Sequence, residues 1–354
     1  MEQAASYHTY HEITTQPQAW EDVLQEINAQ TPQLLASWDQ DKPRSVLFTG
    51  CGSTYYLARA AAVIFQAQTG IPSVAHPASD LVLFPDIFIK DGNKPLLVAI
   101  SRSGETTETL LAVDRFLSLG LGQVIGITCY EDSSLAKMVS TALVARQAHE
   151  ESIAQTRSFT SMLVAAQALA TILAGKSLSD EYLRLPRLGA NLLDDHSALA
   201  KSLGEDAGIE RFFFLGSGPF YGLACETMLK MKEMSLSYSE AFHFMEFRHG
   251  PMSMVDHHSL VVGMLSEMGF SHEVTVLREM RTLGARVLAL YPHALPPEHA
   301  DYQCLLPGGL SDLERGPLYL PVLQMLAFYR SLHNGQNPDK PNNLSAVVHL
   351  NIGS

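Results

Sequence analysis

Short apolar runs alternate with helical patterns along most of this chain, and that alternation limits the folds it can adopt. Apolar runs at 45–49, 96–100 and 123–128 are each followed by a turn and then by a segment with a helical spacing of apolar residues. A further short run closes the series at 142–145. Strands joined by helices of this length form right-handed βαβ units, and such units build a parallel sheet. We therefore expect an α/β fold with three αβα layers.

The pattern starts again in the second half of the chain. Residues 211–224 align with residues 45–58, and residues 260–274 align with residues 95–109, at offsets of 166 and 165 positions. Glycines and serines of the turns coincide in the pairs Gly50 and Gly216, Gly52 and Gly218, Ser101 and Ser266, and Gly104 and Gly269. A chain of 354 residues is long enough for two domains. We interpret the repetition as one fold present twice rather than as an array of short repeats.

The turn at 101–109 reads SRSGETTET and joins an apolar run to a helical pattern. Such a turn directs backbone N–H groups and hydroxyls toward one point, where the helix N-terminus adds partial positive charge. The alternative is ordinary capping of the helix. The second copy reads SEMGFSHEV. At the positions that correspond to Ser103, Thr107 and Thr109 it has residues without a hydroxyl, namely Met268, His272 and Val274. Because capping needs only one hydroxyl, we favour a phosphate site in the first copy and none in the second.

A second strand-to-helix turn, Gly50-Cys51-Gly52-Ser53-Thr54, precedes the next helical pattern. In an open parallel sheet, ligands bind beyond the carboxyl ends of the strands, and both turns should reach that edge. A dinucleotide fold would place a third glycine at Tyr55 and a ribose-binding acid about 20 residues further on, and neither is present. We therefore expect no nicotinamide or flavin and no other cofactor.

The composition excludes several classes of protein. A net charge of −13 argues against general nucleic-acid binding. The four cysteines are scattered without a C-x-x-C pair, which is typical of a reducing compartment and gives no metal signature. The N-terminus has no pattern of a signal peptide, and the longest apolar stretch, near 161–175, is too short to span a bilayer. We expect a cytoplasmic protein that binds neither nucleic acid nor membrane.

The segment 225–235 carries candidate catalytic groups. On a helix, Glu226, Lys230 and Glu233 lie on one stripe at spacings of four and three residues. A surface salt-bridge ladder is the alternative interpretation. The methionines and leucine around these residues make much of the helix apolar, and a carboxylate beside a lysine in such surroundings has the properties of a general base.

A further candidate, His249, lies in the sequence Arg248-His249-Gly250-Pro251, where a rigid turn would hold it. An imidazole there can titrate near neutral pH, although a structural histidine fits the local sequence equally well. The histidines from 243 to 258 do not have the spacing of metal ligands, so we expect no metal. The sequence contains no G-x-S-x-G motif of the kind that marks the nucleophile of a serine hydrolase, so we do not expect this activity.

These motifs, CGST at 51–54, SRSGETTET at 101–109, LKMKE at 229–233 and RHGP at 248–251, resemble the sugar isomerase (SIS) domain family. The resemblance is to paired SIS domains, as in the isomerase half of glucosamine-6-phosphate synthase and in related phosphosugar deaminases and isomerases. It implies two tandem SIS domains, each a parallel sheet of flavodoxin-like type. The family's cysteine glutaminase domain is not among these residues, so free glutamine is not the expected nitrogen donor.

The resemblance also implies roles for individual residues. The phosphate of a hexose phosphate would be bound by Thr54, Ser101, Arg102, Ser103 and Thr106, with Arg102 replacing a glutamine of the synthase. Other substrate contacts would come from Gly52, Ser53 and Gln155, the last in the sequence Ala154-Gln155-Thr156-Arg157. The resemblance assigns proton transfer between C1 and C2 to Glu233, with Lys230 beside it. It assigns ring opening to a histidine of the neighbouring subunit, His249, and hence implies a homodimer with shared active sites.

We expect four segments: a helical arm at 1–30, a phosphate-binding SIS domain at 31–190, a catalytic SIS domain at 191–335, and a tail over the active site at 336–354. In the tail, Ala346 stands where the synthase has an imine-forming lysine, so covalent imine chemistry is not expected from it. The expected function is isomerisation of a hexose 6-phosphate or amino-sugar 6-phosphate, with or without release of the amine. A fructosamine-phosphate deglycase and a catalytically silent sugar-phosphate sensor are the alternatives.

Overall fold

The computed structural model describes residues 4–40, 42–88 and 95–345. It divides into two compact units, which we call unit A and unit B after the sheet that each contains. Among the described residues, unit A consists of those in Thr15–Glu150 and Arg157–Pro186 together with Ser345, and unit B of those in 4–14, Glu151–Thr156 and Arg187–Leu344. This division does not test the domain boundaries predicted above, which stay predictions.

Unit A is built on a sheet of five parallel strands in the order β2-β1-β3-β4-β5. The strands are β1 (Val46–Gly50), β2 (Ser73–Pro77), β3 (Leu96–Ile100), β4 (Val124–Thr128) and β5 (Thr141–Val144). The helical elements are α2 (Ser53–Thr69), α3 (Ala78–Leu83), α4 (Pro85–Phe88), α5 (Thr107–Ser118), α6 (Ser134–Met138), η2 (Arg146–Ala148), α7 (Arg157–Leu173) and α8 (Asp180–Leu183). Most of α1 (His8–Gln40) also belongs to this unit.

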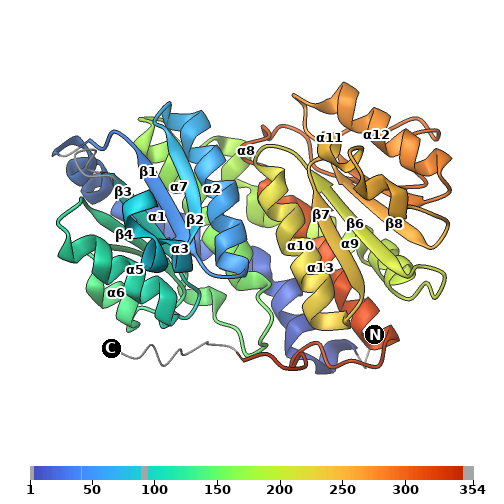
Figure 1. Ribbon diagram of the computed structural model, residues 1–354, viewed down its shortest axis with the longest axis horizontal. Helices are drawn as coiled ribbons and strands as arrows, with labels where there is room; N and C mark the ends of the chain where they lie inside the picture. The colour runs from blue at the N-terminus through green and yellow to red at the C-terminus, as the bar shows by residue number, and fades with distance from the viewer. Residues whose placement is uncertain (1–3, 41, 89–94, 346–354) are drawn as a thin grey trace. The chain divides into compact units, whose positions relative to one another are not determined.

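Both faces of the unit A sheet are covered, which explains its uninterrupted apolar strands. Successive side chains of a strand point to opposite faces. On one face, Leu47 and Leu97 belong to a buried cluster with residues of α3, α5 and α6. On the other face, the ring of Phe48 lies 5.6 Å from that of Phe65 on α2. Helix α2 runs beside the long α7, whose residues from 158 to 170 are all buried (Figure 1).

Unit B contains a second sheet of five parallel strands, in the order β10-β9-β8-β6-β7. The strands are β6 (Arg211–Gly216), β7 (Tyr238–Phe242), β8 (Ser259–Met264), β9 (Arg286–Tyr291) and β10 (Tyr302–Leu305). The helical elements are η1 (Ala4–Ser6), α10 (Phe220–Ser235), α11 (Phe244–Phe247), η3 (Pro251–Met254), α12 (Phe270–Thr282), α13 (Gly316–His333) and most of α9 (Leu185–Gly204). In chain order both sheets follow the pattern 2-1-3-4-5, the flavodoxin-like order, so the predicted fold class is confirmed.

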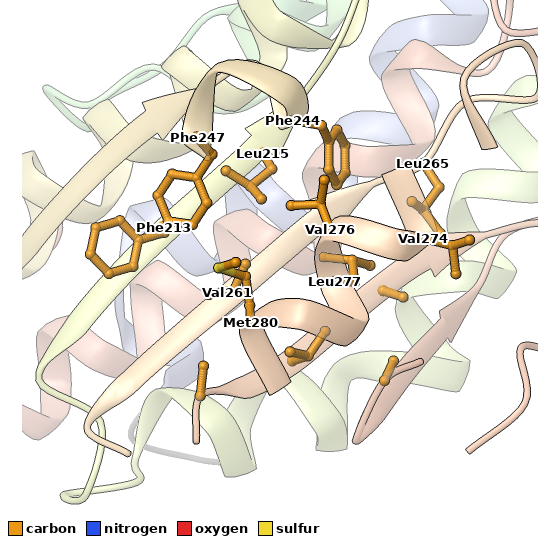
Figure 2. Packing of buried hydrophobic residues seen from close by; sticks show 14 of the residues in the cluster. Phe213, Leu215, Phe244, Phe247, Val261, Leu265, Val274, Val276, Leu277 and Met280 are labelled. Atoms are coloured by element: carbon orange, nitrogen blue, oxygen red, sulfur yellow. The ribbon is translucent and has the colours of Figure 1, made fainter. Parts of the chain in front are cut away.

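The core of unit B lies between its sheet and the helices α11 and α12 (Figure 2). Phe213 on β6 packs against Phe247 on α11, with ring centroids 5.3 Å apart. Val261 on β8 and Met280 on α12 belong to the same buried cluster. On the opposite face of the sheet, α10 packs against α13. Helix α10, which carries the candidate catalytic groups, therefore packs against both the sheet and α13.

In each unit the turns of interest leave neighbouring strands at one edge. In unit A, β1 pairs with β3, so the turns after both strands emerge side by side at the carboxyl edge. In unit B, β6 pairs with β8 in the same way. Gly52 and Gly218, which follow β1 and β6, both have a φ of 56°, a conformation that glycine adopts without strain. Among the described residues, no helix combines the length and apolarity needed to cross a membrane.

Candidate active site

The turn after β3 carries three hydroxyl side chains in unit A, two of which lie side by side. The Oγ of Ser101 lies 3.2 Å from the Oγ1 of Thr106 and accepts a hydrogen bond from the Gly104 N–H at 3.1 Å. The Oγ of Ser103 accepts a hydrogen bond from the Glu105 N–H at 3.1 Å. Gly104 has a φ of 66°, and a Cβ at this position would lie 2.3 Å from the Oγ of Ser133. The turn is therefore closely packed, and only glycine fits at its centre.

The hydroxyls of this turn do not cap the helix that follows. Thr106 is the N-cap residue of α5, and within the described part of the chain its side chain makes no capping hydrogen bond. The first N–H groups of an α-helix have no intrahelical partner. The Thr106 hydroxyl faces Ser101 instead, at 3.2 Å, and does not serve as a cap of α5. This geometry favours the anion-binding interpretation over simple capping.

The turn after β1 contacts α5, the helix that follows the turn after β3. Thr54 is buried, and its Oγ1 both accepts a hydrogen bond from the Cys51 N–H and donates one to the Cys51 carbonyl, each at 2.9 Å. The Sγ of Cys51 lies 3.6 Å from the Oγ1 of Thr109 on α5. Unit A thus joins the two turns that the sequence predicted to share one edge. Burial raises the pKa of the Cys51 thiol to about 11, so that this group stays protonated near neutral pH and is a poor nucleophile.

Arg102 points into the interior of unit A. Its side chain is 7% exposed and forms an ion pair with the fully buried carboxylate of Glu150, at 3.3 Å. Glu150 also accepts hydrogen bonds from the N–H and hydroxyl of Ser158 at the start of α7. The predicted contact of the Arg102 guanidinium with a phosphate therefore stays a prediction. Arg102 and Ser103 also line a hollow of about 360 Å³, together with Glu105, Tyr130, Asp132, Ser133 and Glu150.

Gln155 belongs to unit B, on the loop 151–156. The buried carboxylate of Glu12 accepts hydrogen bonds from the N–H groups of Glu151 and Ser152, at 2.6 and 3.2 Å. Farther along the loop, the Thr156 carbonyl accepts a hydrogen bond from Gln324 on α13 at 3.2 Å. The amide oxygen of Gln155 is buried and has no hydrogen-bond partner among the described residues. An unsatisfied buried acceptor costs free energy, so this oxygen is suited to a ligand.

On α10, the stripe predicted from the sequence is a buried charge cluster and not a surface ladder. The side chain of Lys230 is 1% exposed, and its Nζ lies 3.5 Å from Oε1 of Glu226 and also contacts Oε2 of Glu233. Glu226 is fully buried, whereas Glu233 is 18% exposed. Of the two carboxylates, Glu233 is therefore the one that can reach a ligand.

His249 follows the short helix α11, and its side chain is exposed. The backbone N–H of His249 donates a hydrogen bond to the Glu246 carbonyl at 2.9 Å. The following Gly250 has a φ of 123°, a backbone conformation that residues with a side chain rarely adopt. The preceding Arg248 is fixed by two hydrogen bonds of 2.7 Å to Glu279. The backbone of this segment is thus held firmly, as the His-Gly-Pro sequence predicted. The position of Ala346 in the tail lies outside the described residues.

Two buried carboxylates near the predicted site residues escaped the sequence reasoning. Glu150 neutralises Arg102, and Glu12 holds the loop that carries Gln155. Both lie far along the chain from some of their partners: Arg102 and Glu150 are 48 positions apart, and Glu12 and Glu151 are 139 positions apart. No local spacing signals such pairs, because each depends on how distant segments pack.

Comparison with known proteins places the chain in a family. A model of the SIS domain matches residues 41–172. The structure of glucosamine-6-phosphate deaminase from Thermotoga maritima is similar with a TM-score of 0.77 and 30% identity, over 97% of this chain and 100% of that one. The chain belongs to the SIS domain family.

Two further proteins are similar to nearly the whole chain. The structure of tagatose-6-phosphate ketose/aldose isomerase from Escherichia coli has a TM-score of 0.87 and 26% identity, over 99% of this chain and 98% of that one. Glutamine–fructose-6-phosphate aminotransferase (isomerizing) from Methanothermobacter thermautotrophicus is 28% identical over 95% of this chain. This chain spans 56% of the length of that relative.

Proposed function

We propose that this SIS protein isomerises a hexose 6-phosphate or an amino-sugar 6-phosphate between its aldose and ketose forms, with or without release of the amine. The relatives named above act, by their names, on tagatose 6-phosphate, glucosamine 6-phosphate and fructose 6-phosphate. A 6-phosphate is common to all three. The domain boundaries predicted from the sequence, with phosphate binding in the first SIS domain and catalysis in the second, form part of this proposal.

Phosphate binding in the proposal is the task of the two neighbouring turns of unit A. Ser101, Ser103, Thr106 and Thr54 supply hydroxyls, and the N-terminus of α5 supplies N–H groups and partial positive charge. Backbone N–H groups and hydroxyls recognise a phosphate without a lysine. The remaining proposed substrate contacts are Gly52, Ser53 and Gln155, of which Gln155 is supported by its unsatisfied buried amide oxygen.

The observation that carries the proposal is the environment of Glu233. This carboxylate is partly accessible and contacts a buried lysine, and that lysine is also paired with the fully buried Glu226. Proton transfer requires a carboxylate that is held in place and can still touch the substrate. A protein that only senses a sugar phosphate needs no such group, so the cluster favours an enzyme.

In the proposed reaction, the Glu233 carboxylate removes the proton from C2 of the open-chain aldose. The electron pair of the C2–H bond becomes the C1–C2 double bond, and O1 takes a proton from water, giving an enediol or, for an amino sugar, an enolamine. Glu233 then returns its proton to C1. The enediol loses its O2 proton to give the ketose, whereas the enolamine becomes an iminium ion that water converts to ketose and ammonia. Lys230 holds Glu233 in place, and His249 of a second subunit of a homodimer opens the sugar ring.

Incubation with glucosamine 6-phosphate, followed by assay of ammonia and fructose 6-phosphate, tests the proposal directly. A panel of aldose and ketose 6-phosphates without the amine tests plain isomerisation. We expect turnover of at least one compound, and a loss of about 10²–10⁴-fold in kcat for Glu233→Gln. Glu298→Gln, which changes an exposed carboxylate of the same unit, is the matched control and should retain activity.

Three results would count against this function. Unchanged turnover in Glu233→Gln would remove the proposed base. Binding of sugar phosphates without turnover of any compound would favour a sensor. Release of a free amine only from a fructosamine phosphate would instead identify a deglycase.

A further inference from the structure

Unit B has a turn at the place that corresponds to the phosphate turn of unit A. It joins β8 to α12 through residues 265–269, and β8 is central in its sheet as β3 is in its own. The Gly269 N–H donates a hydrogen bond of 2.9 Å to the Oγ of Ser266, as the Gly104 N–H does to Ser101 at 3.1 Å. The two turns thus share a serine–glycine hydrogen bond that shapes the loop.

The donors of the unit B turn are taken by carboxylates of the chain itself. Asp312 accepts hydrogen bonds from the Glu267 N–H, at 2.9 and 3.1 Å to its two oxygens, and from the Met268 N–H at 3.4 Å. Glu273 accepts from the Ser266 N–H at 2.6 Å and from its hydroxyl at 3.0 Å. Asp312 is 45 residues from Glu267 and precedes α13, so it is not a routine cap of this turn.

A buried arginine completes an anion-binding arrangement around Asp312. The side chain of Arg315 is 1% exposed, and its Nη1 lies 3.4 Å from Oδ1 of Asp312. In the described part of the chain this Nη1 has no hydrogen-bond partner. The other donors of Arg315 go to the Leu310 carbonyl and the Glu267 carboxylate. Adjacent N–H groups and a buried guanidinium together are the donor set that proteins use for phosphate and sulfate.

The phosphate turn of unit A is arranged differently. Its Glu105 accepts hydrogen bonds from the N–H and hydroxyl of Ser134 at 2.7 and 2.8 Å, and so is directed toward α6. Its Arg102 is directed toward Glu150. The corresponding turns therefore differ in two respects. The acidic side chains contact different partners, Ser134 for Glu105 and Arg315 for Glu267, and the turns differ in the number of hydroxyl side chains.

We propose that the turn 266–269 of unit B is a second site for a tetrahedral oxyanion, and that the Asp312 carboxylate occupies it from within the chain. Asp312 supplies the negative charge that a phosphate would supply, to the N–H groups of Glu267 and Met268 and to Arg315. Removing this carboxylate vacates the N–H groups of Glu267 and Met268 and the Nη1 of Arg315, and a phosphate can then bind to them. The site does not depend on the proposed enzyme activity.

The test compares Asp312→Ala with Asp301→Ala, using inorganic phosphate as the probe and chloride at equal ionic strength as the reference. Asp301 is a matched control, because it also accepts a backbone hydrogen bond, from Val287 at 2.9 Å, and pairs with Arg281 at 2.7 Å in unit B. Both variants should unfold at lower temperature than the wild type. Phosphate should raise the unfolding temperature of Asp312→Ala more than that of Asp301→Ala, because a ligand stabilises the state that binds it.

Calorimetric titration then counts the sites. Asp312→Ala should bind one more phosphate per chain than the wild type. The difference should persist when Ser101→Ala and Thr106→Ala remove the proposed site of unit A, so failure of that site is distinguishable from failure of this one. Equal stoichiometry in Asp312→Ala and wild type, or equal response of the two aspartate variants to phosphate, would overturn the proposal.

A second variant covers the case in which Asp312→Ala does not fold. Asp312→Ser keeps a small polar group before α13 and still removes the charge. In this variant phosphate should slow amide hydrogen exchange at Glu267 and Met268, and leave exchange at Val287 unchanged. Exchange at Glu267 and Met268 that does not respond to phosphate would contradict the inference.

Discussion

Arg102 and Glu150 show how one residue's surroundings decide its role. The sequence placed Arg102 among hydroxyls of a predicted phosphate turn, but the folded unit A directs its side chain to a carboxylate 48 residues away. Breaking such a buried pair leaves an uncompensated charge, which costs more than the pair itself contributes. The ion pair therefore constrains which residues can stand at position 102.

We expect Arg102→Gln to lower the free energy of unfolding by about 3–5 kcal/mol, because Glu150 is then buried without its partner. The double variant Arg102→Gln with Glu150→Gln should recover part of that loss, since neither charge remains. Denaturant unfolding of the wild type, both single variants and the double variant measures the coupling. Additive effects of the two substitutions would show that the pair is not energetically coupled.

Glu273 is a buried carboxylate of unit B whose pKa is raised, so it links stability to pH. Burial raises its pKa from 4.5 to about 7, and the charge of Asp312 acts in the same direction. The folded protein thus binds the proton more tightly than the unfolded chain does. The resulting stabilisation is complete below pH 4.5 and is lost as the pH rises through about 7.

For Glu273→Gln, we expect this part of the pH dependence to disappear. The pKa difference corresponds to about 3 kcal/mol, so the wild type should lose stability relative to the variant by up to that amount as the pH rises from 4.5 to about 7. Unfolding by denaturant at several pH values measures the difference. Parallel profiles for the two proteins would mean that Glu273 titrates at its ordinary pKa.

At the scale of elements, the strand-to-helix turns were the most predictable part of the molecule. The turns at 50–54 and 101–106 emerge from neighbouring strands, as the order of apolar runs and glycines indicated. The local sequence did not indicate whether the hydroxyls of the 101–106 turn cap the helix or bind an anion, because both functions require the same residue types. The orientation of the Thr106 side chain toward Ser101 favours the latter.

Gly104→Ala should destabilise the protein by more than its backbone conformation alone explains. A positive φ costs a non-glycine residue about 1–2 kcal/mol, and the added Cβ would also lie 2.3 Å from the Oγ of Ser133. Gly120→Ala is the control, since Gly120 has a φ of 61° and no atom within 4 Å of the added carbon. Thermal or denaturant unfolding should show a smaller loss for Gly120→Ala, and equal losses would exclude the steric contribution.

At the scale of the whole molecule, the chain forms two units with separate cores and the same strand order. The proposed phosphate turn lies in unit A, and the charge cluster of α10 lies in unit B. The family resemblance adds a second subunit, because it assigns ring opening to a histidine of the partner.

Mixing two inactive variants tests this shared-site prediction. If His249 of one subunit serves Glu233 of the other, a dimer of Glu233→Gln with His249→Ala contains one intact site and one doubly altered site. After unfolding and refolding together, an equal mixture should recover about a quarter of wild-type activity, because half of randomly formed dimers are mixed. Activity that stays at the sum of the separate variants would place both residues in one subunit.

The amino-acid sequence by itself determined most of the strands, the turns and the stripe of Glu226, Lys230 and Glu233, whereas β7 and β10 were not predicted. These features follow from neighbours in the chain, through apolar periodicity, glycine conformation and helical spacing. Only the tertiary structure decided that the stripe is buried, that Arg102 is paired with Glu150, and that Asp312 fills the second turn. Burial and charge pairing depend on segments that meet from far apart in the chain, and no local pattern encodes which segments meet.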